Sequence, residues 1–407
     1  NEEQIITLDN VLAEVKVRGN WTTNYNKKPL RIKFNEKQNI LNLNEGNKFK
    51  NWVLLASYKD WSFMRDITGY TIGRILSPDY YSSDYKLVEV YVNDEYWGVY
   101  VLVEQQEIDE NRINLDDAEE NPSVKTGYVI EYDSYFYQED INTIFTINYG
   151  TLFYRNNEEV LYVNNGYTIK NDLNEKTGKN QRDYIESYMR KLWKTCYDAI
   201  MHKKYIDIDG LPNDTVLNTK DFLSKYVDIE SLVDTYILHE IVCDPDVYLT
   251  SFYMTIDLAS NKRLTFEAPW DFDSTMGNKR HLPNEQGLYA GVVGMDVNYE
   301  KRGSGNPWLI LFARENWFMD MVKSKWNEKK DLIFDQVITQ ISELTEKHAA
   351  CFERNQKRWK NVGVYETVGN ELSEESRKCK TQQQAAVLLI EWLEERKKTF
   401  DIGINSL

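Results

Sequence analysis

The stretch APWDFDSTMGN, residues 268–278, places two carboxylates, Asp271 and Asp273, on either side of a phenylalanine. It follows the run KRLTFE, which predicts a β-strand, and it ends in small residues that predict a turn. Carboxylates at i and i+2 share one face of a strand, and Mg²⁺ accepts one or two of them together with phosphate oxygens. The same pattern is also typical of a strand that ends in an Asx turn without a metal.

The composition is that of a globular protein, with 407 residues of which 42% are hydrophobic, 13% aromatic and 28% charged. The formal net charge of −16 argues against a nucleic-acid partner held by a general basic field. The four cysteines form no C-x-x-C pair and so give no support to a zinc site. No apolar run reaches about 18 residues, so we expect no membrane span.

Strand patterns dominate the first 170 residues. The runs EVKVRGN and KPLRIKF alternate apolar and polar residues, and KLVEVYVNDEYWGVYVLVEQ predicts a hairpin that turns at Asn93–Asp94. Between these runs, the apolar spacing in YKDWSFMRDITGYTIGRIL predicts one helix over residues 58–76.

Helical periodicity takes over after about residue 175. Helices are predicted over 180–200 and 228–242, and long helical segments are predicted from Pro307 to near Phe400. A short β-hairpin over 250–273 interrupts them. We therefore expect an α+β protein with two lobes and a cleft between them: a strand-rich lobe over 1–170, and a mostly helical lobe over 171–407 that holds the hairpin and its aspartates.

A second acidic cluster, CDPDVYLTSF, lies between a predicted helix and a predicted strand. A carboxylate there, such as Asp246, can orient a hydroxyl nucleophile, although Pro245 also suits a plain helix-ending turn. The chain has neither G-x-x-x-x-G-K-[ST] nor G-x-G-x-x-G. RGNWTTNYNKK is the one loop suited to lie over phosphates, although taken alone it is more typical of a plain surface turn. A basic strand, a helix, a hairpin, an aspartate turn and then Asp-Phe-Asp is the order of parts in a protein kinase.

Four blocks of the sequence together resemble the CotH proteins, a family of atypical kinases first associated with the bacterial spore coat. The blocks are VRGNWTTNYNKKPLRIKF, NWVLLASYKDWSFMRD, VEVYVNDEYWGVYVLVEQ and PWDFDSTMGN, and RNQKRW and EWLEERKK resemble the C-terminal helices of the family. The resemblance covers most of the chain and implies one kinase-like unit over residues 1–405. Such a protein binds ATP with Mg²⁺ or Mn²⁺ and phosphorylates Ser/Thr-rich proteins that are secreted, on the cell surface or in the spore coat.

The resemblance also implies roles for individual residues. Asp271 is expected to be the metal ligand with Asp273 beside it, and Asp246 is expected to be the catalytic-loop aspartate. The residues expected near the nucleotide are Arg18 at the phosphates, Lys28 or Lys33 as the phosphate-contacting lysine, and Glu104 at the interlobe connection near the adenine.

Two points of this assignment stay open. Alternation along KPLRIKF turns Lys33 away from the apolar strand face and towards the cleft, but it does not exclude Lys28. Kinases commonly carry Asn five residues after the catalytic aspartate as a second metal ligand, whereas this chain has Ser251, whose hydroxyl is a poorer ligand.

The departure at Ser251 keeps a second function in view, a non-catalytic binding or adhesion module in an extracellular assembly such as a spore coat or cellulosome. A third function, a sugar-cleaving enzyme with paired carboxylates, suits the many aromatic residues but not the order of the blocks.

Overall fold

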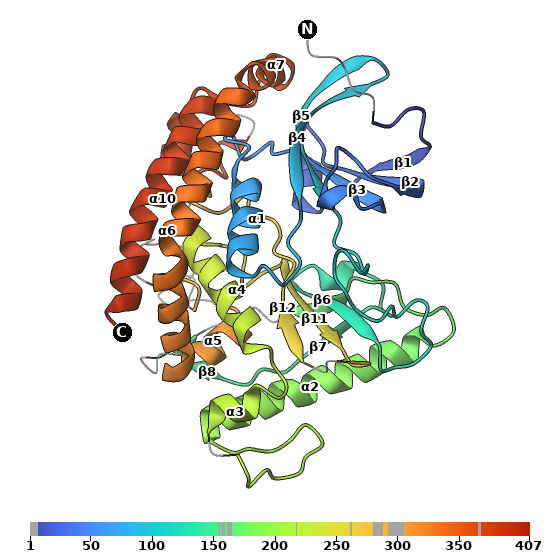
Figure 1. Cartoon of the computed structure of the whole chain (residues 1–407), viewed down its shortest axis with the longest axis vertical. Helices are drawn as coiled ribbons and strands as arrows, with labels where there is room; N and C mark the ends of the chain where they lie inside the picture. Colours follow the sequence, from blue (N-terminus) through green and yellow to red (C-terminus); the bar gives the residue numbers. More distant parts are fainter. Residues whose placement is uncertain are drawn as a thin grey trace.

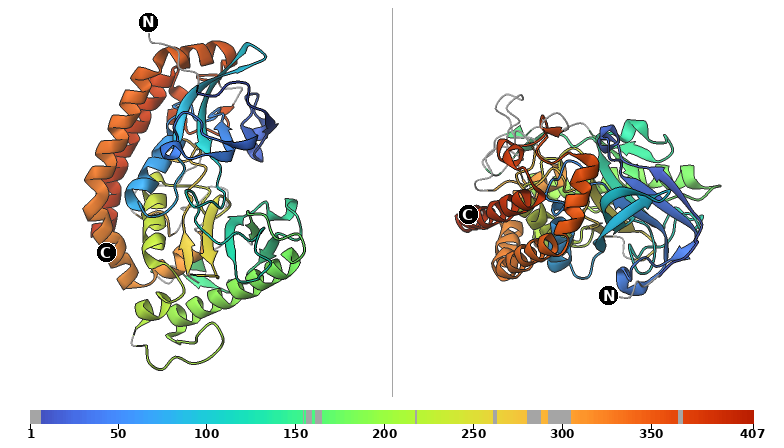
Figure 2. Two further views of the ribbon diagram at one scale, coloured as in Figure 1. Left: turned by 45° about the vertical axis from the view of Figure 1, so that its right-hand side comes forward. Right: turned by 90° about the horizontal axis from the view of Figure 1, so that it is seen from above.

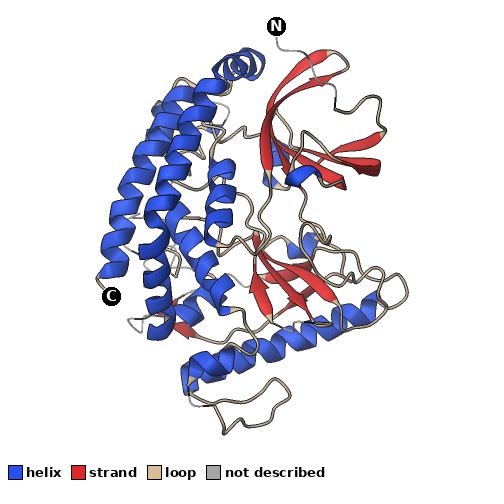
Figure 3. Cartoon of the chain, viewed as in Figure 1, coloured by secondary structure: helices blue, strands red, loops and turns tan. Residues whose placement is uncertain are grey.

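The computed structural model describes residues 7–153, 155, 159–160, 165–216, 218–260, 263–279, 288–291, 305–364 and 368–407. Within these residues the chain is an α+β protein built on two five-stranded antiparallel sheets (Figure 1). Helices cover one side of both sheets (Figure 3).

The first sheet has the strand order β1-β2-β3-β5-β4. Its strands are β1 (Ala13–Val17), β2 (Leu30–Gln38), β3 (Phe49–Leu55), β4 (Tyr85–Val92) and β5 (Glu95–Glu104). The predicted hairpin is β4–β5, and its turn residues Asn93 and Asp94 have φ of 50° and 64°. Two left-handed residues in succession are what a tight hairpin turn requires, so this local prediction is confirmed.

The second sheet has the order β12-β11-β6-β10-β7 and combines distant parts of the chain. Its strands are β6 (Gly127–Asp133), β7 (Ile144–Thr146), β10 (Gly166–Ile169), β11 (Phe252–Asp257) and β12 (Leu264–Phe266), and a small ribbon pairs β8 (Leu152–Phe153) with β9 (Glu159–Val160). β6 is thus paired directly with β11 of the predicted hairpin. The expected boundary at residue 170 therefore does not separate the two sheets, which divide between β5 and β6.

The helices follow the predicted periodicity closely in the second half of the chain. They are α1 (Arg65–Leu76), α2 (Gly178–His202), α3 (Thr219–Leu223), α4 (Ile229–Val242), α5 (Pro307–Ala313), α6 (Asn316–Lys347), α7 (Ala349–Trp359), α9 (Glu374–Lys378) and α10 (Gln382–Asn405). Side-chain caps fix several starts: Asp228 accepts from the Ser231 amide at the start of α4, and Asn306 accepts from the Trp308 amide at the start of α5.

The long helices α6 and α10 run side by side along the flank of both sheets (Figure 2). α6 contacts α1 near the first sheet and α4 near the second, and α10 also contacts α4. This arrangement connects the two sheets through helices that come from the C-terminal third of the chain.

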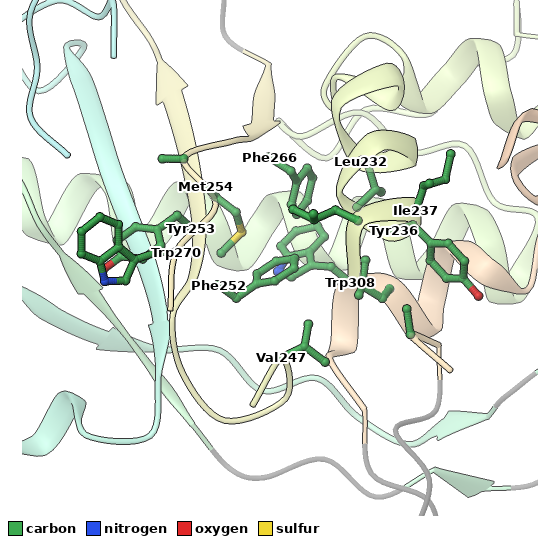
Figure 4. Packing of buried hydrophobic residues seen from close by; sticks show 14 of the residues in the cluster. Leu232, Tyr236, Ile237, Val247, Phe252, Tyr253, Met254, Phe266, Trp270 and Trp308 are labelled. Carbon is green, nitrogen blue, oxygen red and sulfur yellow. The ribbon is translucent and has the colours of Figure 1, made fainter. Parts of the chain in front are cut away.

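The largest apolar core spans strands of both sheets, and it includes α4, α5 and the β11–β12 hairpin. Phe266 packs between Phe252 and Trp308, with ring centroids 5.8 and 5.9 Å apart, and Figure 4 shows these rings together with Leu232 of α4. Burying an aromatic side chain of this size stabilises the fold by about 2–3 kcal/mol. The core thereby fixes β11 and β12, the strands that lead into and away from the acidic segments.

Candidate active site

A cleft with a volume of about 850 Å³ collects most of the charged residues singled out by the sequence. Both sheets, the loop between β1 and β2, and the segments around residues 57–59, 246–251 and 270–274 line it. The predicted site residues among its lining are Arg18, Asp246, Ser251, Asp271 and Asp273.

The two aspartates lie in an irregular turn and not on a strand. β12 already ends at Phe266, and Ala268 and Asp271 have φ of 61° and 69°. The expectation that both carboxylates share a strand face is therefore wrong, because left-handed backbone breaks the alternation that it assumed. We call residues 271–278 the aspartate turn. Amides of Thr275 and Asn278 donate to carbonyls three residues earlier, at 3.0 Å each.

The segment 59–66 holds the aspartate turn in place. Asp66 accepts a hydrogen bond from the Phe272 amide at 2.9 Å. The Arg65 guanidinium donates to the carbonyls of Thr275 at 3.0 Å and Met276 at 3.2 Å. Phe272, Thr275 and Met276 are all buried, so these hydrogen bonds satisfy backbone groups of the turn that water cannot reach.

The same segment corrects the predicted helix over 58–76, which begins only at Arg65. Residues 57–64 instead wrap around the Asp60 carboxylate, which accepts from the amides of Ser62 at 3.0 Å and Arg65 at 2.9 Å and forms a buried ion pair with the Arg65 guanidinium. These residues form a loop despite their helical apolar spacing, because the amides of Ser62 and Arg65 donate to the Asp60 side chain and not to the carbonyls four residues earlier.

Lys59 is the site residue that sequence reasoning missed. Its ammonium lies 2.9 Å from the Asp273 carboxylate and donates to the Ser274 hydroxyl at 2.6 Å. Burial alone would lower the pKa of Lys59, but Asp273, Tyr25 and Asp246 outweigh burial and raise it. Lys59 therefore stays charged in the cleft. Its place in the block NWVLLASYKDWSFMRD was the available signal, hidden by the prediction of a helix.

The charged form of the Asp271 carboxylate is disfavoured by its surroundings. Burial first, and the charge of Asp273 second, raise its pKa to about 7, while Lys59 lowers it. The Ser251 hydroxyl donates to it at 3.3 Å. Burial together with Asp273 and Asp271 also raises the pKa of Asp66 well above its ordinary value. Crowded carboxylates of this kind favour a cation between them.

The donor set fits a hard divalent cation. In the described part of the chain no three His, Cys, Asp or Glu side chains converge as a metal site, so protein carboxylates alone do not complete one. Asp271 and Asp273 with the Ser251 hydroxyl offer oxygen ligands only, and Mg²⁺ typically takes one or two carboxylates and draws the rest from phosphate and water.

The predicted catalytic loop begins where α4 ends. Cys243 has φ 45° and terminates the helix, and Asp244 pairs with His239 at 3.0 Å and accepts from the Asp246 amide at 2.8 Å. Burial would raise the pKa of Asp246, but Lys279, 2.7 Å away, and Lys59 bring it below the ordinary value. Asp246 is thus an ionised carboxylate at the cleft surface. His239 is a buried histidine packed against Phe252 and beside Asp244.

Arg18 lies in the cleft and the two predicted lysines do not. The Arg18 guanidinium stacks over the Trp270 ring at 5.2 Å. The Lys28 ammonium turns back to the Thr23 carbonyl at 2.6 Å, and Lys33 is exposed on β2, outside the cleft lining. Alternation gave the right face, since Arg31 does line the cleft, but Lys33 lies two residues too far along the strand.

Glu104 ends β5 as expected, but its carboxylate belongs to a buried network. It accepts from Arg112 at 3.0 Å, from Asn44 at 2.7 Å and from the Asp84 amide at 2.8 Å. The next two residues, Gln105 and Gln106, line the cleft instead. Glu104 therefore stabilises the end of β5 from outside the cleft lining.

A scan against family models matches residues 15–400 to the family described as CotH kinase protein. No curated protein matches the chain. No helix in the described residues is long and apolar enough to cross a membrane. The family match contains the aspartate turn, Lys59 and the catalytic loop, and it supports a kinase-like function in broad terms. Because it covers nearly all of the 407 residues, the chain belongs to the CotH kinase protein family.

Proposed function

We propose that this protein is an ATP- and divalent-metal-dependent protein kinase that phosphorylates Ser or Thr of secreted, spore-coat or surface-assembly proteins. The two sheets with their helices would then correspond to the two lobes of a kinase. The observation that carries the proposal is the alternation of charge in one cleft: Lys59 pairs with Asp273, Lys279 pairs with Asp246, and Asp271 lines the same cleft.

Each group has a task in phosphoryl transfer. Asp271 and Asp273 would hold a divalent metal, which when bound offsets charge on the phosphate oxygens. Lys59, in place of Lys28 or Lys33, would contact the phosphates, and Arg18 would lie beside them. Asp246 is ionised and at the cleft surface, so it can accept a hydrogen bond from the acceptor hydroxyl and orient it for attack. The phosphoryl group leaves ADP as the Ser or Thr oxygen bonds to phosphorus, and the hydroxyl proton passes to Asp246 or to solvent.

A non-catalytic binding module in an extracellular assembly is the second candidate. Two observations favour it: Ser251 replaces the usual amide ligand, and Lys59 is already paired with Asp273 at 2.9 Å. A protein of this kind would bind nucleotide or a partner without transferring phosphate.

Transfer of labelled γ-phosphate from ATP, to the protein itself and to a Ser/Thr-rich substrate, separates the two candidates. We expect label with Mg²⁺ or Mn²⁺ in the wild type and none in Asp271→Ala. An unlabelled wild type whose melting temperature still rises with nucleotide would select the binding module. An unlabelled wild type that also ignores nucleotide would remove both.

A further inference from the structure

Ser251 adopts a backbone that serine rarely takes. Its φ is 59°, in the left-handed region, where a residue with a Cβ pays a steric cost. This backbone accompanies a hydroxyl that points to Asp271, with Oγ 3.3 Å from Oδ2. Strained backbone persists only where the surroundings enforce it, and at functional sites the strain often serves to place a group.

Glu131, on β6, provides that enforcement. Its Oε1 accepts from the Ser251 amide at 3.1 Å, and also from the Thr250 hydroxyl at 3.4 Å. The pairing of β6 with β11 sets Glu131 opposite Tyr253, two residues beyond Ser251. The acid is 6% exposed, and it lines the cleft.

The charge of Glu131 is compensated on its other side. The Lys170 ammonium lies 2.9 Å from its Oε2, so Oε1 remains directed at residues 250 and 251. The neighbouring acid on the same face of β6, Asp133, accepts from the Thr250 hydroxyl at 3.0 Å and contacts the Tyr135 amide, but no bond links it to Ser251. The strand therefore offers two similar acids of which one holds Ser251.

We propose that Glu131 is a positioning residue of the metal site, which holds Ser251 in its left-handed backbone and so fixes the serine hydroxyl beside Asp271. With its backbone held by Glu131, Ser251 would supply the oxygen ligand that an asparagine supplies at this place in protein kinases. The inference rests on the proposed function, because it assumes that Asp271 and Ser251 face a metal.

Binding of Mn²⁺, measured by electron paramagnetic resonance with and without a non-hydrolysable ATP analogue, tests the inference without relying on catalysis. Glu131→Ala should weaken Mn²⁺ binding at least about tenfold, as loss of an outer-shell partner typically does. Glu131→Gln keeps an oxygen that can accept from the Ser251 amide, so it should weaken Mn²⁺ binding less than Glu131→Ala does. The matched control, Asp133→Asn, should bind within about twofold of the wild type.

A double-variant comparison separates positioning from a general structural role. If Glu131 acts through the Ser251 hydroxyl, its removal should matter little once that hydroxyl is gone. In the Ser251→Ala background, Glu131→Ala should therefore weaken Mn²⁺ binding by less than a further factor of about two. Ser251→Asn should bind Mn²⁺ at least as tightly as the wild type, because Asn tolerates left-handed backbone and its amide oxygen is a better ligand. The serine variants keep the test decisive if Glu131→Ala does not fold.

Three results would overturn the inference. Unchanged Mn²⁺ affinity in Glu131→Ala would do so, and so would fully additive losses in the double variant. If Asp133→Asn weakened Mn²⁺ binding as much as Glu131→Ala, Glu131 would have no specific positioning role. A wild type that binds no Mn²⁺ with nucleotide would instead remove the proposed function itself. Mn²⁺ binding that persists in Asp271→Ala would show that the ion lies elsewhere, and it would remove the proposed function as well.

Discussion

The aspartate turn and the loop of residues 18–25 face the same cleft, but the protein holds them very differently. The turn receives hydrogen bonds from Asp66 and Arg65, and its Met276 amide donates to the Val242 carbonyl at 2.7 Å. The loop contains only a short 3-10 helix, Trp21–Asn24, whose bonds are mostly exposed, and Trp21 is 56% exposed.

One carboxylate joins the loop to the distant C-terminal segment. Glu371 Oε2 accepts from the Tyr25 hydroxyl at 2.5 Å and from the Trp21 indole at 3.0 Å. Local opening is easiest where backbone bonds are few and contacts are exposed. The comparison teaches that the aspartate turn, our proposed metal side, is held by buried backbone hydrogen bonds. The loop, our proposed nucleotide side, is held mainly by side-chain contacts: the Glu371 carboxylate, the stacking of Tyr25 on Tyr58 at 5.5 Å and the Arg18–Trp270 contact.

Removing the guanidinium under the turn should have the largest effect on the comparison. Arg65→Met leaves Asp60 as a buried unpaired carboxylate and frees two carbonyls of the turn, so we expect a loss of about 3–5 kcal/mol in the free energy of unfolding. Arg74→Met, on the same helix with a half-exposed partner 3.6 Å away, should cost about 1 kcal/mol or less. Chemical denaturation measures both, and equal losses would mean that Arg65 does not anchor the turn.

Lys59→Met tests which lysine contacts the phosphates. Loss of its charge should lower kcat/KM for phosphate transfer about 100-fold, which corresponds to roughly 3 kcal/mol of transition-state stabilisation. Lys28→Met should stay close to the wild type, because the Lys28 ammonium binds a loop carbonyl. A larger loss in Lys28→Met than in Lys59→Met would restore the lysine expected from the sequence.

Gly277→Ala probes how tightly the turn is packed. Gly277 has φ 72°, and an added Cβ would lie 2.6 Å from the Trp392 ring of α10, so we expect a loss of about 2–3 kcal/mol in stability. Gly210 has φ 89° with nothing within 4 Å of an added Cβ, and Gly210→Ala should cost only about 1 kcal/mol. The difference in melting temperature between the two variants isolates the contact with Trp392. Equal falls in melting temperature would show that α10 moves to accommodate the added Cβ.

Glu371→Ala should have the smallest effect on stability and act on the loop alone. Both hydrogen bonds are at least partly exposed, so the free energy of unfolding should fall by less than about 1 kcal/mol. The KM for ATP should rise about threefold with little change in kcat, since the loop would close less readily over the nucleotide. A fall in kcat with an unchanged KM would argue against this role of Glu371.

Local patterns predicted the fold well, and contacts between distant residues decided the site. The β4–β5 hairpin and α4 were predictable because turn residues and apolar spacing determine them. Lys59 was not predicted because it lies in a loop held by the Asp60 carboxylate, in a segment whose apolar spacing predicts a helix. The carboxylate of Glu104 binds Arg112, a contact between side chains that the sequence pattern does not indicate. Alternation gives the face of Lys33 but not its distance from the cleft.

Hydrogen exchange, followed by mass spectrometry with and without Mn²⁺ and a non-hydrolysable ATP analogue, tests the central claim most directly. The claim is that the aspartate turn is a preformed metal–nucleotide site beneath a loop that closes on binding. Peptides over 268–278 should exchange slowly already in the free protein, and peptides over 18–25 should exchange quickly and slow at least about tenfold when the analogue binds. A turn that exchanges as fast as the loop, or a loop that ignores the analogue, would contradict the claim.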